Sequence, residues 1–188
     1  MEQYEASLCN LLHADIARQR LLFNAPPRTS RIRLMIGMLS PRFAPVLLYR
    51  LAYATNRKGL KVLARFFSLL NYTFFGIEIA VVCKIGPGLF FPHTQGTVIG
   101  AVSIGANAVI YQGVTLGAKD LDFTYDEAHR PVIGNNIVVG AGAKVLGGVT
   151  VGNNVVVGAN SVLLIDVPDD VVVAGMPAKI VKQRAIQS

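Results

Sequence analysis

Aliphatic residues recur at every sixth position through the second half of this chain. The longest unbroken series comprises Ile133, Val139, Val145, Val151, Val157 and Leu163. Two shorter series upstream keep the same step, one from Ile79 to Phe91 and one from Val98 to Leu116. A period of six matches neither the 3.6 residues of a helical turn nor the two of a simple strand. It is typical of a solenoid in which each short flat side turns one aliphatic side chain inward.

A second series supports the solenoid. Small or β-branched residues stand four positions after these aliphatic residues, at Ala143, Val149, Val155, Ser161 and Val167. The pairs Asn135-Asn136 and Asn153-Asn154 suit corners that need a positive φ or local side-chain hydrogen bonds. The alternative is a β-sandwich of short strands, which so regular a step disfavours.

Two interruptions of the period mark special sites. The first adds one residue between Phe91 and Val98 and contains Pro92 and His93. The second spans residues 117–132, which we expect to hold two further six-residue units and a short polar excursion. Segments inserted into repeat proteins project from one face and often bind ligands, and the alternative is a surface loop without a role.

The first 76 residues lack the six-residue period and show helical patterns instead. We predict helices over 3–22, 42–56 and 58–75, separated by Pro26-Pro27 and by a turn at residues 56–59. The chain therefore divides into an α-helical segment (1–76), a β-solenoid (77–182) and a C-terminal tail (183–188). The fold class is mainly β.

Charge divides along the same line. The helical segment carries 11 Lys and Arg residues and 3 acidic residues, whereas residues 77–188 carry 7 and 8. One interpretation is a cap that closes the open end of the solenoid and helps subunits assemble. The other is peripheral contact with anionic lipid. Nucleic acid is not expected, because no aromatic stacking platform accompanies the arginines.

Composition indicates a compact protein of 188 residues, of which 52% are hydrophobic. The two cysteines, Cys9 and Cys83, are far apart and form no CxxC motif, which favours a reducing compartment. Neither a signal peptide nor an apolar run of about 18 residues is evident. We therefore expect a cytoplasmic protein, with the inner face of the membrane as a peripheral alternative.

Several motifs resemble those of one known family. They are Gly76-Ile77-Glu78-Ile79, Lys84-Ile85-Gly86-Pro87-Gly88-Leu89, Pro92-His93-Thr94-Gln95-Gly96, Gln112-Gly113-Val114-Thr115-Leu116-Gly117, Val139-Gly140-Ala141-Gly142-Ala143 and Ala174-Gly175-Met176-Pro177-Ala178-Lys179. Together they resemble the serine acetyltransferases and their relatives among the hexapeptide-repeat acyltransferases, which include polysaccharide O-acetyltransferases. The resemblance covers about residues 76–182. It implies a left-handed parallel β-helix, a homotrimer with active sites between subunits, acetyl-CoA as acyl donor, a hydroxyl acceptor and no metal.

The resemblance also assigns catalytic roles. His93 matches the general base that takes the proton of the acceptor hydroxyl, and a histidine suits this task at neutral pH. Glu78 matches the acidic partner that orients the imidazole, where the family usually has Asp. No covalent enzyme intermediate is required. For the CoA donor, the resemblance implies contacts at Gly117, Ala118, Ala141 and Ala159, with Lys179 and Lys182 meeting the nucleotide phosphates.

The acceptor motifs depart from the family pattern. Pro92 replaces an Asp before the catalytic His, and the stretch that holds another Asp in the family reads Leu39-Ser40-Pro41-Arg42 here. The family's Arg-His before Pro is reversed to His129-Arg130, whose side chains we expect at the acceptor. An ammonium buried without an anion is costly. We therefore predict a sugar hydroxyl of surface polysaccharide biosynthesis as acceptor, with serine acetylation for cysteine biosynthesis as the alternative. A non-catalytic scaffold is the alternative of another class.

Overall fold

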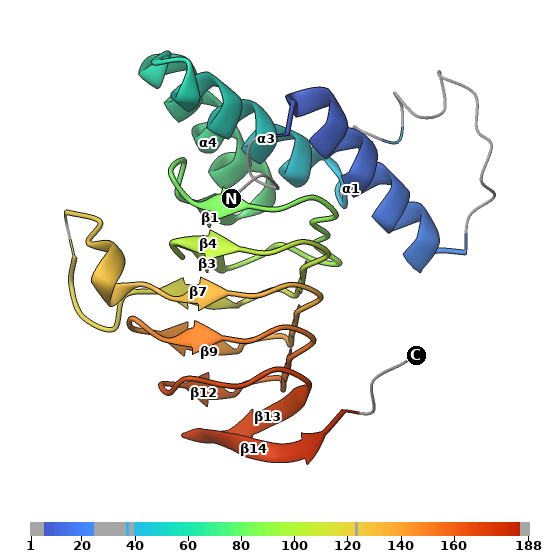
Figure 1. Ribbon diagram of the computed structural model, residues 1–188. Helices are drawn as coiled ribbons and strands as arrows, with labels where there is room; N and C mark the ends of the chain where they lie inside the picture. The colour runs from blue at the N-terminus through green and yellow to red at the C-terminus, as the bar shows by residue number, and fades with distance from the viewer. Residues whose placement is uncertain (1–5, 25–36, 38–39, 123, 185–188) are drawn as a thin grey trace.

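The computed structural model describes residues 6–24, 37, 40–122 and 124–184. Within these residues, three helices lie across one end of a stack of short strands, and a long loop projects from the stack (Figure 1). The chain folds as a left-handed parallel β-helix with a helical N-terminal segment, which confirms the predicted fold class.

The three helices are α1 (Leu8–Leu22), α3 (Ala44–Arg57) and α4 (Lys61–Phe75). The predicted ends at 22, 56 and 75 agree to within one residue, but the helices begin later than predicted. For α1, Ser7 caps the helix by accepting a hydrogen bond from the Asn10 amide, and residues 1–5 lie outside the described residues. For α4, Gly59 with φ +77° makes a turn that delays the start.

The strands form three sheets, one on each side of the coil. The first sheet contains β1 (Ile77–Ile79), β3 (Thr97–Ile99), β6 (Thr115–Gly117), β9 (Lys144–Leu146) and β12 (Val162–Leu163). The second contains β2 (Lys84–Ile85), β4 (Ser103–Ile104), β7 (Val132–Ile133) and β10 (Thr150–Val151). The third contains β5 (Val109–Ile110), β8 (Val138–Val139), β11 (Val156–Val157), β13 (Val171–Gly175) and β14 (Ala178–Gln183). All pairings are parallel except that of β13 with β14, which closes the far end.

The six-residue series forms the dry interior, with one exception. Residues of both predicted series are buried, from Ile79 to Leu163 and from Ala143 to Val167. Val98 was predicted to point inward, and this is wrong. Its side chain is 39% exposed, whereas Ile99 is buried and pairs with Ile79 and Leu116. The corner before β3 is thus longer than predicted, and a shift of one residue turns a strand side chain to the other face.

The corners between the second and third sheets are held by a ladder of amide side chains. Asn107, Asn136 and Asn154 all have φ between 55° and 61°, as predicted for corner asparagines. Asn107 donates to Asn136 at 3.0 Å, Asn136 to Asn154 at 3.0 Å, and Asn154 to Asp170 at 2.9 Å. The repeat in the sequence therefore becomes a column of hydrogen bonds that aligns successive coils.

The helices join the solenoid through a shared core. Val46 and Tyr49 of α3 belong to the same buried cluster as the first coil, and the Tyr49 hydroxyl donates to the Cys83 carbonyl at 2.7 Å. The outer face of α4, in contrast, exposes Val62, Phe66 and Phe74. No helix within the described residues is long and apolar enough to cross a membrane.

A buried ion pair fastens α1 and α3 to the first coil. Arg50 and Asp15 have fully buried side chains, with Arg50 Nε 2.9 Å from Asp15 Oδ2. Arg50 also donates to the carbonyls of Ile85 and Gly86, each at 2.6 Å. Asp15 accepts from the amides of Gly88 at 2.8 Å and Leu89 at 2.9 Å. Arg50, counted among the charges of the basic segment, is therefore not part of its surface.

The long insertion occupies a single corner. It leaves the first sheet at Gly117 and returns to the second sheet at Val132, with one 3-10 turn (Glu127–His129) on the way. The two additional six-residue units predicted here are absent from the described part of this segment. The hydrophobic period could not show this, because the loop replaces one corner and adds no further coil to the stack.

Candidate active site

His93 lies on the edge of the coil that joins the third sheet to the first. We call the corners at residues 92–96, 111–114, 140–143 and 158–161 the histidine edge. These corners are stacked by backbone hydrogen bonds: Gly113 N to Gln95 O at 2.9 Å, Gly142 N to Gln112 O at 2.8 Å, and Asn160 N to Ala141 O at 2.8 Å. His93 is exposed at the helical end of this edge, so its ring is available to a ligand.

The corner that carries His93 is anchored to the end of α4. The Thr94 hydroxyl donates to the Phe75 carbonyl at 2.7 Å, and the Gly96 amide donates to the Gly76 carbonyl at 2.9 Å. Gly76 ends the helix with φ +59°, a left-handed conformation that glycine adopts without strain. Phe75 and Gly76, which precede β1, therefore hold the corner that carries His93 in place.

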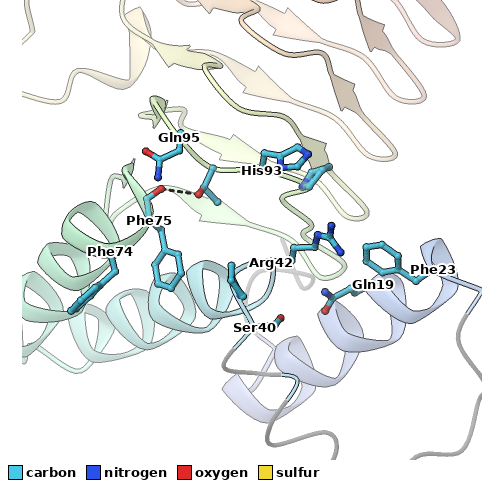
Figure 2. Close-up of a pocket in the computed structure, with 11 residues that line it drawn as sticks. Gln19, Phe23, Ser40, Arg42, Phe74, Phe75, His93 and Gln95 are labelled. Atoms are coloured by element: carbon cyan, nitrogen blue, oxygen red, sulfur yellow. Dashed lines mark hydrogen bonds between the residues drawn. The ribbon is translucent and has the colours of Figure 1, made fainter.

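A cavity of about 720 Å³ opens beside His93. Its walls come from α1, from the segment before α3, from the end of α4 and from the His93 corner, as Figure 2 shows. The lining residues are Gln19, Phe23, Ser40, Pro41, Arg42, Phe74, Phe75, Pro92, His93, Thr94 and Gln95. A smaller hollow on the other side of Arg42 and His93 extends toward Tyr111. The cavity therefore has room for a small molecule next to the imidazole.

Gln19, Phe23 and Arg42 line the cavity, but the sequence did not predict them as site residues. Gln19 and Phe23 belong to α1 and its C-cap, about 70 residues before His93, and no local pattern links them to the histidine corner. Arg42 was noted only because it belongs to the stretch in which the family carries an Asp. That stretch does reach the cavity.

Glu78 projects from the outer face of the first sheet. It is exposed in the middle of β1 and is in register with Val98 of β3. It does not line the cavity, and no hydrogen bond joins its carboxylate to His93 within the described part of the chain. Its predicted role as partner of the imidazole stays a prediction.

The residues predicted to contact the donor separate into two groups. Ala141 and Ala159 lie on the histidine edge, and Lys179 pairs with Ala174 one coil beyond. Lys182 pairs with Val172, farther back on β13. Gly117 and Ala118 instead stand where the first sheet ends and the long insertion begins. An added Cβ at Gly117 would meet no atom within 4 Å, so this place has room for a ligand chain. The first sheet separates the two groups within one chain.

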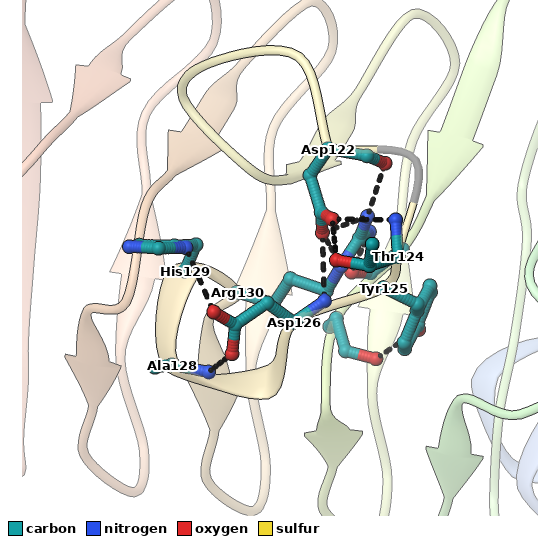
Figure 3. A network of polar contacts seen from close by, with 9 residues as sticks. Asp122, Thr124, Tyr125, Asp126, Ala128, His129 and Arg130 are labelled. Atoms are coloured by element: carbon teal, nitrogen blue, oxygen red, sulfur yellow. Dashed lines mark hydrogen bonds and ion pairs between the residues drawn. The ribbon is translucent and has the colours of Figure 1, made fainter.

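Arg130 is held inside the long insertion, as Figure 3 shows. Its Nε and Nη2 atoms donate to Asp122 Oδ2 at 3.0 and 2.7 Å, and its Nη1 atom donates to the Gly100 carbonyl at 2.9 Å. The guanidinium carbon lies 3.8 Å from the centre of the Tyr125 ring. His129 is 71% exposed and lies 3.2 Å from Asp126. We call the corner at residues 117–132, which carries the long insertion, the insertion edge. His129 and Arg130 lie on this edge and do not line the cavity, whereas Pro92 does.

Asp122 in the insertion and Cys83 in the first coil have shifted pKa values. Partial desolvation raises the pKa of Asp122, but hydrogen bonds from Arg130 and Thr124 outweigh it and lower that pKa to about 2. Burial raises the pKa of Cys83 to about 12, so this thiol stays protonated and is no nucleophile at neutral pH. Within the described residues, no three His, Cys, Asp or Glu side chains gather closely enough to hold a metal ion.

Comparison with known proteins identifies similar molecules. The model of a family described as bacterial transferase hexapeptide (six repeats) matches residues 130–164. A serine acetyltransferase of Helicobacter pylori is 38% identical over 170 residues, which are 90% of this chain and 96% of the relative. The crystal structure of a serine acetyltransferase from Vibrio cholerae aligns with a TM-score of 0.80 at 30% identity, covering 98% of this chain and 70% of that one. A serine acetyltransferase of Brucella abortus strain S19 in complex with coenzyme A aligns with a TM-score of 0.78 at 31% identity, covering 93% and 68%.

These similarities contradict the prediction of a sugar acceptor in polysaccharide biosynthesis. That prediction gave decisive weight to Pro92 and to the absent Asp of the helical segment, which are two positions of the acceptor pocket. The relatives match along nine-tenths of the chain and are serine acetyltransferases. The findings support the alternative, serine acetylation.

Proposed function

This chain belongs to the serine acetyltransferase family of hexapeptide-repeat transferases, and we propose that it transfers an acetyl group from acetyl-CoA to the hydroxyl of serine. It is an acetyl-CoA-dependent acyltransferase. The observation that supports serine most directly is the similarity to serine acetyltransferases over 170 residues. The exposed imidazole of His93 beside a cavity that suits a small acceptor agrees with it.

In this proposal His93 is the general base. A hydroxyl is a weak nucleophile until a base removes its proton, so the imidazole takes that proton as the oxygen attacks the thioester carbon. The attack forms the C–O bond and gives a tetrahedral oxyanion, which backbone amides can stabilise. The C–S bond breaks when this intermediate collapses. The protonated imidazole then returns the proton to the departing sulfur. The neutral histidine is thereby regenerated, and no covalent enzyme intermediate forms.

We propose Glu78 as a positioning residue for His93. Both side chains are exposed, and the strand of Glu78 pairs with the strand that follows the histidine corner. A carboxylate that accepts a hydrogen bond from the imidazole fixes its tautomer and stabilises its protonated form. Because Glu is one methylene longer than the Asp usual in the family, its carboxylate has a longer reach from β1.

We propose a homotrimer in which two subunits build each site. The histidine edge carries His93, Ala141 and Ala159, whereas Gly117, Ala118 and the long insertion belong to another edge of the same coil. A thioester substrate that uses both groups needs them face to face, and one chain holds them apart. A neighbouring subunit that presents its insertion edge to this histidine edge brings them together. In this assembly residues 77–182 are the catalytic domain and residues 1–76 are its cap.

Two more expectations from the sequence are retained as proposals. We place the reaction in the cytoplasm, and we propose a peripheral contact of the helical segment with anionic lipid. The contact is supported by the exposed Val62, Phe66 and Phe74 on α4. It is also supported by charge, because Asp15 is the only carboxylate among described residues 6–24 and 40–76 and it is buried against Arg50.

The proposed function is tested by the rate of thiol release from acetyl-CoA. With serine as acceptor we expect saturable release of CoA and stoichiometric formation of O-acetylserine by mass spectrometry. Alanine, which has the same charged groups and no hydroxyl, is the matched control and should give only background hydrolysis. Serine-dependent release no faster than that with alanine would show that serine is not the acceptor.

A further inference from the structure

The cavity beside His93 has an unusual charge for a site that accepts an amino acid. Among the described residues that line it, Arg42 and His93 are the only ionisable ones, and none is a carboxylate. A free amino acid brings one ammonium and one carboxylate. The described wall of this cavity therefore offers a charged partner to the carboxylate and none to the ammonium.

Arg42 is placed to meet a ligand. It lines both the main cavity and the smaller hollow, and His93 lines both with it. Its guanidinium carbon lies 5.2 Å from the centre of the Phe23 ring, and Figure 2 shows the side chain between that ring and His93. The residue is exposed, and none of the ion pairs within the described part of the chain includes it.

Two other arginines and the carboxylate of Asp15 are engaged elsewhere. All three guanidinium nitrogens of Arg130 donate hydrogen bonds within the insertion. Arg50 and Asp15 neutralise each other in the interior. Since an arginine fork binds a carboxylate in bidentate fashion, Arg42 is the group on this chain best suited to hold an acidic acceptor.

We propose that Arg42 forms an anion-binding subsite that holds the carboxylate of the acceptor while His93 activates its hydroxyl. This inference rests on the proposed function, because it names the part of serine that the site recognises. On the described cavity wall of this chain, the ammonium meets only neutral oxygen atoms, from side chains such as Gln19 and Ser40. The site thus selects a hydroxy acid and tolerates the loss of the amino group.

Three acceptors separate these features of serine. L-Serinamide keeps the hydroxyl and the ammonium but lacks the carboxylate, and glycerate keeps the hydroxyl and the carboxylate but lacks the ammonium. For the wild type we expect kcat/KM for glycerate to lie within about tenfold of that for serine. A lost charge-assisted hydrogen bond should lower kcat/KM for serinamide by about ten- to a hundredfold.

Variants of Arg42 complete the experiment. R42Q should lower kcat/KM for serine and glycerate by about ten- to a hundredfold, mainly through KM, and leave the value for serinamide unchanged. R42K should recover part of the loss, because it restores the charge without the fork. Lys61→Gln, an exposed cation on α4 outside the cavity, is the matched control and should behave as wild type. Circular dichroism checks that all variants fold.

The outcomes for this inference and for the proposed function can be told apart. Equal use of serine and serinamide by the wild type, or an equal loss with both in R42Q, would overturn the Arg42 subsite and leave serine acetylation standing. Arg42-dependent acetylation of glycerate without any of serine would overturn serine as the acceptor and keep the subsite. Failure of all three acceptors would overturn both.

Discussion

His93 stands at a corner where the coil is longer than elsewhere. The corner at residues 92–96 is stacked on the corner at 111–114 like the others of this edge, but it holds one residue more and also contacts the end of α4 through Thr94. A histidine in a regular unit would face either the dry interior or the flat outer surface of a sheet. The irregular corner instead sets the ring beside a cavity built with the helices.

Replacement of His93 tests its role as base. In His93→Asn we expect kcat to fall by about a hundred- to ten-thousandfold, because the hydroxyl then attacks without a base to take its proton. The measurement is thiol release with saturating serine. His13→Asn, at an exposed position of α1 that does not line the cavity, is the control and should lose less than tenfold. Comparable losses in both variants, or none in His93→Asn, would remove His93 from the mechanism.

Asp122 gives the insertion a pH dependence. Its pKa in the folded chain is lowered from 3.8 to about 2, so its ionised form stabilises the loop at all pH values above about 4. Most of this stabilisation is lost as the pH falls from about 4 to about 2, where half of the Asp122 carboxylate is protonated in the folded chain.

Hydrogen exchange measures this loss. Asp122 accepts hydrogen bonds from the amides of Thr124 and Asp126, each at 2.9 Å. In Asp122→Asn we expect these amides to exchange faster than in the wild type at pH 5, and the difference to vanish near pH 2. A difference that persists unchanged at pH 2 would show that the charge of Asp122 does not order the loop.

At the scale of elements, the helices and the solenoid are joined by polar contacts inside an apolar interface. Asp15 on α1 and Arg50 on α3 meet backbone groups of the first coil that point out of its open end. An uncapped solenoid leaves such groups without partners. The ion pair therefore completes the hydrogen bonding of the first coil and fixes the position of α1, which contributes Gln19 and Phe23 to the cavity.

Removal of one member of this pair should be costly. Arg50→Met leaves the Asp15 carboxylate buried without its cation, and we expect the free energy of unfolding to fall by about 3–5 kcal/mol. Urea denaturation followed by circular dichroism measures the change. Lys58→Met, an exposed residue just after the same helix, is the control and should change stability by about 0.5 kcal/mol or less. A loss below 1 kcal/mol in Arg50→Met would show that the pair is not an anchor.

At the scale of the whole molecule, the proposed site depends on a second chain. The donor contacts predicted at Gly117 and Ala118 and those predicted at Ala141 and Ala159 lie on different edges, with the first sheet between them. Flat sheets of a three-sided coil suit side-by-side packing around a threefold axis. In the proposed trimer, the edge of one subunit that bears His93 meets the edge of its neighbour that bears the insertion.

Mixed trimers test this arrangement. His93→Asn should remove the base, and Ala118→Glu should block the predicted donor groove with a charged side chain. Each variant alone should be nearly inactive in thiol release. After co-refolding, we expect activity to return, because some grooves then combine the intact histidine edge of one subunit with the intact insertion edge of another. If the two variants do not complement although mixed trimers form, each site lies within one chain.

The periodic part of the molecule could be predicted from the amino-acid sequence alone. In a solenoid, the burial pattern is set within each six-residue unit. The unit itself therefore shows which side chain points inward and which asparagine lies at the corner. Residues 133–163 therefore matched the predicted interior position by position. The family motifs around His93 were local as well, and they indicated an acetyl-CoA-dependent transferase.

The contacts between residues far apart in the sequence depend on the tertiary structure. Ile99 replaced Val98 in the interior because the length of the preceding corner depends on its contacts with α4 and Gly76. Asp15 pairs with Arg50, and Arg42 lines the same cavity as His93, because of the way the helices pack on the solenoid. The six-residue repeat does not encode the relative positions of these helices. The physical reason is that a period reports burial along the chain, whereas the charge lining a cavity depends on contacts between segments tens of residues apart.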